Sequence, residues 1–230
     1  MTFLNKLIAS LQNIAEVGGP VVMTLMAVSL VTLAVVLYKI WQFSAAGVGR
    51  HKALTQAITA WDAGDRPGAK AALGKSTSYL APVVALALDA EGRDDIAVAS
   101  ASERLEAEAE IRFARLERGL RYLDNVAQLA PLLGLFGTVL GMIEAFQALQ
   151  DAGSQVDPSV LAGGIWVALL TTAVGLVVAM PTSVALSWLE GRMDAERVIA
   201  GRAIQTVLAP MGSKPAAAAK AGGAGQPALA

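Results

Sequence analysis

Three long apolar runs without a charged side chain dominate the pattern along the chain. They cover residues 21–37, 125–143 and 161–188, and the third run has 28 residues. At about 1.5 Å rise per helical residue it extends about 42 Å, more than the ~30 Å hydrocarbon core of a bilayer. The first run is short for a span, but Tyr38 and Trp41 can extend it as interfacial anchors. The pattern predicts an all-α membrane protein with three transmembrane helices.

Lysine and arginine are distributed unevenly between the segments outside these runs. Of the 18 basic residues, 17 lie in 39–123 or after Trp188, whereas the loop 150–160 has none. Cytoplasmic segments next to membrane helices carry an excess of Lys and Arg. We therefore predict that the N-terminus and this loop face outward. The segment between the first two spans and the C-terminal tail are predicted to be cytoplasmic.

Small and weakly polar residues recur along the third run at steps of three or four. Such a stripe on one helix face indicates either close helix packing or the wall of a wet pore. We interpret it as a face that needs helices of sister subunits, which predicts a homo-oligomer around a central pore. The stripe consists of Gly164, Ala168, Thr171, Thr172, Gly175, Ala179, Ser183 and Ser187.

The segment before the second run is predicted to be helical. Residues 97–123 contain no proline and a single glycine, Gly119, and Leu105, Leu116 and Leu123 follow a near-heptad spacing. We therefore expect one uninterrupted helix that extends from the cytoplasm into the second span. Turns are expected at residues 62–68 and 74–78, and short amphipathic helices are expected before, between and after these two turns.

Composition excludes several kinds of chemistry. The chain has no cysteine, so it has no thiol catalysis, zinc–thiolate site or disulfide. The single histidine, His51, lies between Arg50 and Lys52 and is interpreted as a solvated side chain. Residues 69–76 fit a relaxed phosphate-loop pattern, but a turn rather than a strand precedes them, so nucleotide binding is not expected. We expect no enzyme, no metal, no cofactor and no nucleic-acid partner.

The second and third runs carry a resemblance to a known family. Residues 129–146, Leu-Ala-Pro-Leu-Leu-Gly-Leu-Phe-Gly-Thr-Val-Leu-Gly-Met-Ile-Glu-Ala-Phe, strongly resemble the corresponding span of the ExbB/TolQ/MotA proton-channel family, most closely its ExbB branch. Residues 164–181 resemble its second signature. The matching helix-packing positions are Pro131, Gly134, Gly137, Gly141, Gly164, Gly175 and Pro181.

The resemblance implies a function and partners. It implies a pentameric proton-channel or stator subunit in the bacterial inner membrane, which surrounds a single-span partner of the ExbD/TolR type with a membrane aspartate. Protons, the transported ion, would then drive a TonB/TolA-type energy transducer that serves outer-membrane transport. The positions that match the family's pore threonines are Thr138 and Thr172, with Thr171 and Val167 as possible pore-adjacent residues. The surroundings would be membrane lipids.

With the resemblance, the chain divides into eight predicted segments. Residues 1–19 are expected to form a periplasmic amphipathic helix that ends at the turn Gly18-Gly19-Pro20. The remaining segments are transmembrane helices 20–40, 121–149 and 161–189, a cytoplasmic helical domain 41–120, a periplasmic loop 150–160, a cytoplasmic helix 190–209 and a disordered tail 210–230.

One departure from the family pattern leaves alternatives open. Many ExbB and TolQ proteins carry a glutamate at the position of Val167, so this chain contributes no carboxylate to the channel. The spans contain no ionisable group between Asp124 and Glu144 or between residues 158 and 189, so the chain needs a partner's carboxylate or water to carry protons. The alternatives are a TolQ-like subunit for envelope maintenance and a structural membrane scaffold without conduction. A small-molecule transporter is disfavoured because no inverted repeat is visible.

Overall fold

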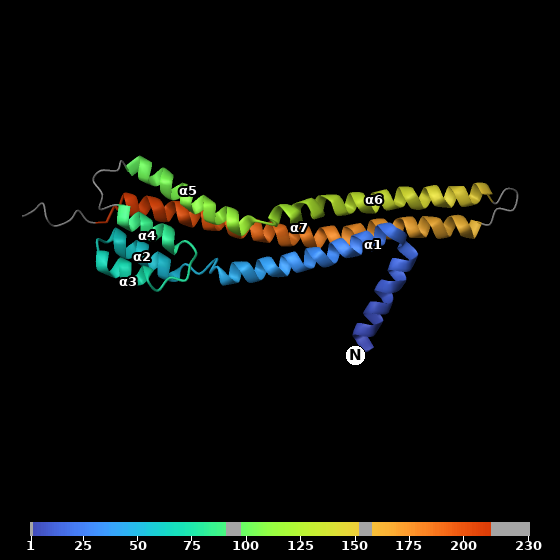
Figure 1. Ribbon diagram of the computed structural model, residues 1–230, viewed down its shortest axis with the longest axis horizontal. Coiled ribbons are helices and arrows are strands. Elements are labelled where there is room, and N and C mark those ends of the chain that lie inside the picture. Colours follow the sequence, from blue (N-terminus) through green and yellow to red (C-terminus); the bar gives the residue numbers. More distant parts are fainter. Residues whose placement is uncertain (1, 91–97, 152–157, 213–230) are drawn as a thin grey trace, which may run out of the picture. The chain divides into compact units, whose positions relative to one another are not determined.

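The described part of the chain is built from helices. The computed structural model describes residues 2–90, 98–151 and 158–212, with side chains from Gly18 onward. Within these residues every regular element is an α-helix, which agrees with the predicted all-α class (Figure 1). The helices are α1 (Thr2–Ala45), α2 (Lys52–Asp62), α3 (Arg66–Leu73), α4 (Ala81–Ala90), α5 (Val98–Glu117), α6 (Leu120–Asp151) and α7 (Pro158–Leu208).

Three of these helices are long and apolar enough to cross a membrane. They are the Gly18–Ala45 part of α1, α6 and α7, and each contains one of the three predicted apolar runs. Large apolar side chains on all three are open to the surroundings of the single chain, among them Leu30, Leu135 and Val177. Apolar surface of this extent is typical of contact with lipid or with other membrane helices. The chain is a membrane protein.

A sharp bend divides α1 where the sequence predicts a turn. Gly19 has φ 66° and ψ −163°, a conformation outside the helical region, and Pro20 follows it. Glycine adopts positive φ without steric cost, and proline is well suited to the first turn of the helix that starts there. The predicted turn between an N-terminal helix and the first span is thus observed. The apolar face expected over residues 1–19 lies outside the side chains that the structure describes.

The expectation of one uninterrupted helix from residue 97 into the second span is wrong. Helix α5 ends at Glu117 and α6 begins at Leu120, with Arg118 and Gly119 in a turn between them. Gly119 has φ +91°, which a side chain would disfavour. A single glycine in an otherwise helical pattern was therefore enough to end the helix. By contrast, α6 continues through Pro131, as predicted, and α7 continues through Pro181.

The short helices of the middle segment form as the turn signals predict. Asp65 caps the N-terminus of α3, because its side chain accepts a hydrogen bond from the Gly68 backbone N–H at 2.9 Å. Residues 69–73 lie inside α3, and no strand precedes them in the described range 52–65. The phosphate-loop resemblance at this place is therefore accidental.

The chain divides into two compact units. The membrane unit comprises Met1–Gln42 and Glu117–Gly191, and the helical unit comprises Phe43–Leu116 and Arg192–Ala230. In the membrane unit, a core cluster joins α1, α6 and α7 through Leu25, Val126, Ala130, Val178 and Ala179. In the helical unit, the buried residues include Leu54, Trp61, Leu80, Leu105 and Phe113.

Candidate functional site in the membrane unit

Helices α6 and α7 approach each other closely where both carry small residues. A Cβ at Gly137 would lie 2.7 Å from the Thr171 Cβ, and a Cβ at Gly141 would lie 3.2 Å from the Ala168 Cβ. Side chains larger than hydrogen on α6 would thus push the helices apart. Figure 1 shows α6 and this part of α7 running side by side. The glycines of the predicted second-span signature therefore serve as a contact face.

Thr171 lies in the middle of this contact. Its side chain is 2% exposed, and its hydroxyl donates to the Gly134 carbonyl on α6 at 3.1 Å and to the Ala168 carbonyl on α7 at 2.7 Å. The single hydroxyl hydrogen is therefore shared between a carbonyl of the facing membrane helix and one of its own helix. The structure places Thr171 in the helix contact rather than on an open face.

The third-span glycines extend the contact in both directions. A Cβ at Gly175 would lie 2.6 Å from the Ala130 carbonyl oxygen, and a Cβ at Gly164 would collide with the Ala145 side chain. Four residues of the α7 stripe thus contact α6 of the same chain, whereas Ser183 and Ser187 are exposed. The four are Gly164, Ala168, Thr171 and Gly175. For these four positions the expected contact with sister subunits is wrong, because single-sequence periodicity does not tell which helix lies opposite. The homopentamer itself stays a prediction.

Thr138 lies on a different face of α6. It lines a groove of about 480 Å³ together with Val139, Met142, Ile143, Phe146, Gln147 and Gln150. Its hydroxyl donates to the Leu135 carbonyl at 2.6 Å, and a hydroxyl that donates one hydrogen bond can still accept others. This face therefore offers hydroxyl and amide groups within an otherwise apolar groove. The sequence did not single out Gln147 and Gln150, although both recur at helical steps after Ile143.

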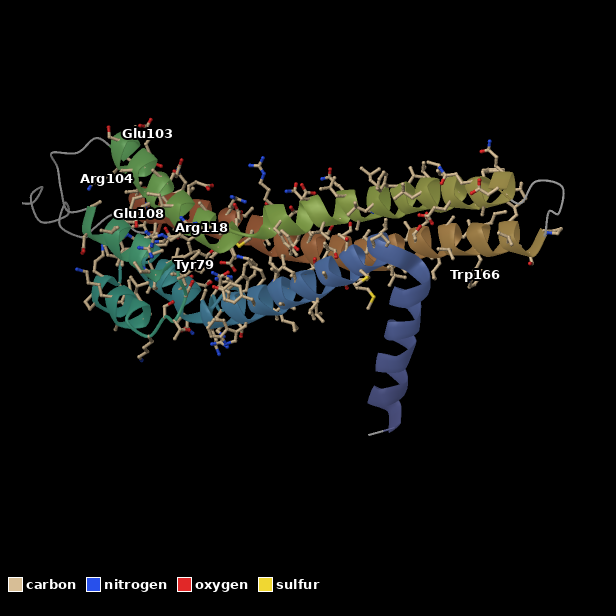
Figure 2. All side chains as sticks on the ribbon, turned by 45° about the vertical axis from the view of Figure 1, so that its right-hand side comes forward. Tyr79, Glu103, Arg104, Glu108, Arg118 and Trp166 are labelled. Carbon is tan, nitrogen blue, oxygen red and sulfur yellow. The ribbon has the colours of Figure 1, made fainter. Side chains whose placement is uncertain are left out.

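The other predicted site residues occupy intermediate or outer positions. Thr172, Val167 and Pro131 are partly buried, and Pro181 is exposed. Thr172 follows the buried Thr171, so its side chain is turned by about 100° around α7. Trp166 is 65% exposed and points away from α6 (Figure 2). The single chain thus brings Thr171 together with Gly134 and Gly137, whereas Thr172 is not among the residues that line the Thr138 groove.

Ionisable groups are absent from the apolar parts of α6 and α7. Between Asp124 and Glu144, and between residues 158 and 189, the sequence has no Asp, Glu, Lys, Arg or His. In the described residues, no group of three or more His, Cys, Asp or Glu side chains could hold a metal ion. The hydroxyls and amides of these helices can orient water or a proton carrier, but they cannot themselves release or bind protons near neutral pH.

Three membrane-capable helices, two of them in close backbone contact, define a multi-span helical membrane protein. The chain belongs to the MotA/TolQ/ExbB proton channel family, whose model matches residues 74–200. The family resemblance predicted from the two signatures is thereby confirmed.

Several relatives share parts of this region. A relative described as an ExbB homolog from Methanothermobacter thermautotrophicus is 37% identical over 135 residues, 57% of this chain and 46% of that protein. The biopolymer transport protein exbB1 of Vibrio cholerae is 49% identical over 63 residues, 27% of this chain and 28% of that protein. The Tol-Pal system protein TolQ of Haemophilus influenzae is 42% identical over 80 residues, 35% of each chain. The chain spans less than half the length of each of these relatives.

Proposed function

We propose that the chain is the proton-channel or stator subunit of an ExbB-type motor in the bacterial inner membrane. In this role it couples the proton-motive force to outer-membrane transport. The family match and the relatives named as biopolymer transport proteins support the proposal. The proton is the transported ion, and the function requires no cofactor.

The observation that carries the proposal is the separation of two faces on α6. One face, with Gly134, Gly137 and Gly141, is covered by α7. The other face carries Thr138 in an open groove with two glutamines and no ionisable side chain. An intramembrane proton path needs an ionisable group. The groove therefore suits a partner helix that brings a carboxylate of its own.

The proposed assembly combines this requirement with the family resemblance. A homopentamer would surround single-span partners of the ExbD/TolR type, with Thr138 and Thr172 on the proton path and Thr171 and Val167 next to it. The partner would pass work to a TonB/TolA-type transducer. The charge distribution of the sequence supports a periplasmic N-terminus and a cytoplasmic C-terminus.

A second candidate is a membrane scaffold of the same family that does not conduct protons. One observation and one implication of the family resemblance favour it. The Thr138 hydroxyl already donates to its own helix, and this chain has Val167 at the position where the resemblance implies a glutamate. A TolQ-type motor for envelope maintenance is a variant of the main proposal, and the Haemophilus relative supports it. Both motor variants require proton flux, whereas the scaffold does not.

Reconstitution with a single-span partner separates these functions. The chain is co-purified with a partner that carries one membrane aspartate, the complex is placed in liposomes, and proton entry is followed with an internal pH dye under an imposed pH gradient. The motor proposal expects flux from the complex, and loss of flux when the partner's aspartate is changed to asparagine. An assembled complex with the same flux as the asparagine control would establish the scaffold function.

A further inference from the structure

The turn that follows the first membrane helix is held by specific backbone geometry. We call residues 46–50 the exit turn. Gly47 and Gly49 in it have φ of 72° and 83°. The Val48 N–H donates to the Phe43 carbonyl at 3.1 Å, and the Ala46 carbonyl accepts from the Tyr79 N–H at 3.2 Å. The exit turn is therefore an ordered structure in the helical unit and is tied to the segment before α4.

A buried carboxylate on α7 binds the same turn. Glu196 is 2% exposed. Its Oε1 accepts hydrogen bonds from the Gly49 N–H at 2.7 Å and from His51 Nε2 at 2.8 Å, and its Oε2 accepts from the Tyr79 hydroxyl at 3.0 Å. Tyr79 also packs its ring edge-on against Phe113, with centroids 6.0 Å apart (Figure 2 labels Tyr79). Three segments distant in sequence thus meet at one side chain.

This arrangement corrects the sequence-based view of His51. The histidine was expected to be solvated, but its side chain is only 18% exposed and contacts Glu196. Because an ionised carboxylate only accepts hydrogen bonds, Nε2 must carry a hydrogen. Among the described residues, the buried Nδ1 atom of His51 has no hydrogen-bond partner. The carboxylate therefore selects the ring orientation and the Nε2–H form of the ring.

Burial of the Glu196 carboxylate is unfavourable compared with burial of an apolar side chain. Taking its charge out of water destabilises the fold unless hydrogen bonds compensate, and an apolar residue of the same size often stabilises the fold as well or better. Hydrogen bonds fix direction, which apolar packing does not. The three donors around Glu196 therefore indicate a role in fixing the exit turn in one position.

We propose that Glu196 is a positioning residue that locks the exit turn onto α7, so that movement of the first membrane helix is passed to α7 through this carboxylate. The coupling part rests on the proposed function, whereas the lock itself does not. Gly49 adds specificity to the lock, because a Cβ there would meet the Arg192 guanidinium and the φ of 83° would be strained.

Two substitutions at Glu196 separate hydrogen bonding from charge. Glu196→Leu keeps most of the volume and removes all three acceptor contacts. Glu196→Gln keeps an oxygen for Gly49 and His51, and its amide can donate to the Tyr79 oxygen. Asp194→Leu is the matched control, because its side chain lies two residues away on α7 and is 76% exposed.

Hydrogen–deuterium exchange over residues 46–50 measures the lock. Hydrogen bonds to charged groups are stronger than those between neutral groups, so Glu196→Leu should speed exchange there about 10–100-fold. Glu196→Gln and Asp194→Leu should stay close to wild type. Unchanged exchange in Glu196→Leu overturns the lock. If that variant does not fold, His51→Phe removes one donor and should still speed exchange several-fold; unchanged exchange there overturns the lock as well.

The single histidine gives an independent spectroscopic readout. In protein with ¹⁵N-labelled histidine, one ring signal should report the Nε2–H form in wild type and Glu196→Gln, and a mixture of forms in Glu196→Leu. The coupling part is tested in the reconstituted complex, where Glu196→Leu should conduct protons but deliver less work per proton to the transducer. If Glu196→Leu speeds exchange in the exit turn but delivers the same work per proton as wild type, the coupling part of the proposal is overturned. Absence of flux in wild type would instead refute the proposed function and leave the exchange result on the lock standing.

Discussion

The Thr171 hydroxyl on α7 donates a hydrogen bond to the Gly134 carbonyl on α6, 3.1 Å away. Side-chain to backbone bonds between membrane helices require that the backbones lie close together. Here Gly134 and Gly137 provide that proximity, because a Cβ at either would meet Thr171 at 3.0 Å or less. A single threonine and two glycines on the facing helix thus form one packing unit.

Gly175→Ala should destabilise this unit. The new methyl group would lie 2.6 Å from the Ala130 carbonyl oxygen, a backbone atom that cannot turn aside. Overpacking of this kind costs about 1–3 kcal/mol, so the midpoint of thermal aggregation in detergent should fall by several degrees. Gly163→Ala is the control on the same helix, because a Cβ there has no neighbour within 4 Å. Equal midpoints for both variants would show that the α6–α7 contact is looser than described.

Thr138→Val should keep expression and assembly but lower proton flux in the reconstituted complex. Valine keeps the shape of threonine and removes the hydroxyl from the α6 groove. Thr172→Val is expected to act in the same direction. Thr24→Val is the control, because its exposed hydroxyl bonds the Pro20 carbonyl of its own helix at 2.9 Å. Normal flux in both Thr138→Val and Thr172→Val would assign these residues to packing.

Val167→Glu should be tolerated and leave flux equal or higher. Val167 is partly buried one turn before Thr171, and the proposed channel would let a carboxylate there remain hydrated. Leu169→Glu is the contrasting variant, because Leu169 is 61% exposed on the apolar surface of α7. Size-exclusion chromatography and flux measurement compare the two. Loss of assembly in Val167→Glu would place residue 167 against lipid or a dry interface.

Trp61→Phe should loosen the end of α7 within the helical unit. The Trp61 indole N–H donates to the Val207 carbonyl at 3.1 Å, and Trp61 is 4% exposed. Phenylalanine leaves this carbonyl without its donor at a cost of about 1 kcal/mol. Hydrogen–deuterium exchange should therefore rise several-fold over residues 203–209 and stay unchanged in α6. A uniform rise throughout the chain would indicate general destabilisation instead.

The sequence predicts where the membrane helices lie better than it predicts where helices end or which helices pack together. Charge-free runs of sufficient length identify all three membrane-capable helices, because water and bilayer impose strong demands on composition. The end of α5 was missed, since Gly119 alone distinguishes it and glycine inside a helix is only mildly unfavourable. The contact of Gly164, Ala168, Thr171 and Gly175 with α6 was also missed, because periodicity identifies a contact face but not the helix that covers it.

The polar contacts of the helical unit were beyond single-sequence reasoning for a different reason. Gly49 and Glu196 are 147 positions apart, and neither belongs to a recognisable motif. The charged neighbours of His51 suggested solvent exposure, whereas the fold brings a buried carboxylate to its ring. A glutamate among Met193, Ala200 and Ala203 on the buried face of α7 was the available signal. Such an acid calls for donors from elsewhere in the chain.

The contact between α6 and α7 also restricts how the membrane unit can work. From Gly134 to Gly141 the two backbones have almost no intervening layer of side chains, so there is little soft material between them to compress or repack. We therefore expect α6 and α7 to move together as one rigid pair rather than to separate from each other. In the proposed motor, movement of this pair would require conformational change at the ends of α6 and α7 and at their contact with α1. Probes of motion will be most informative at those places.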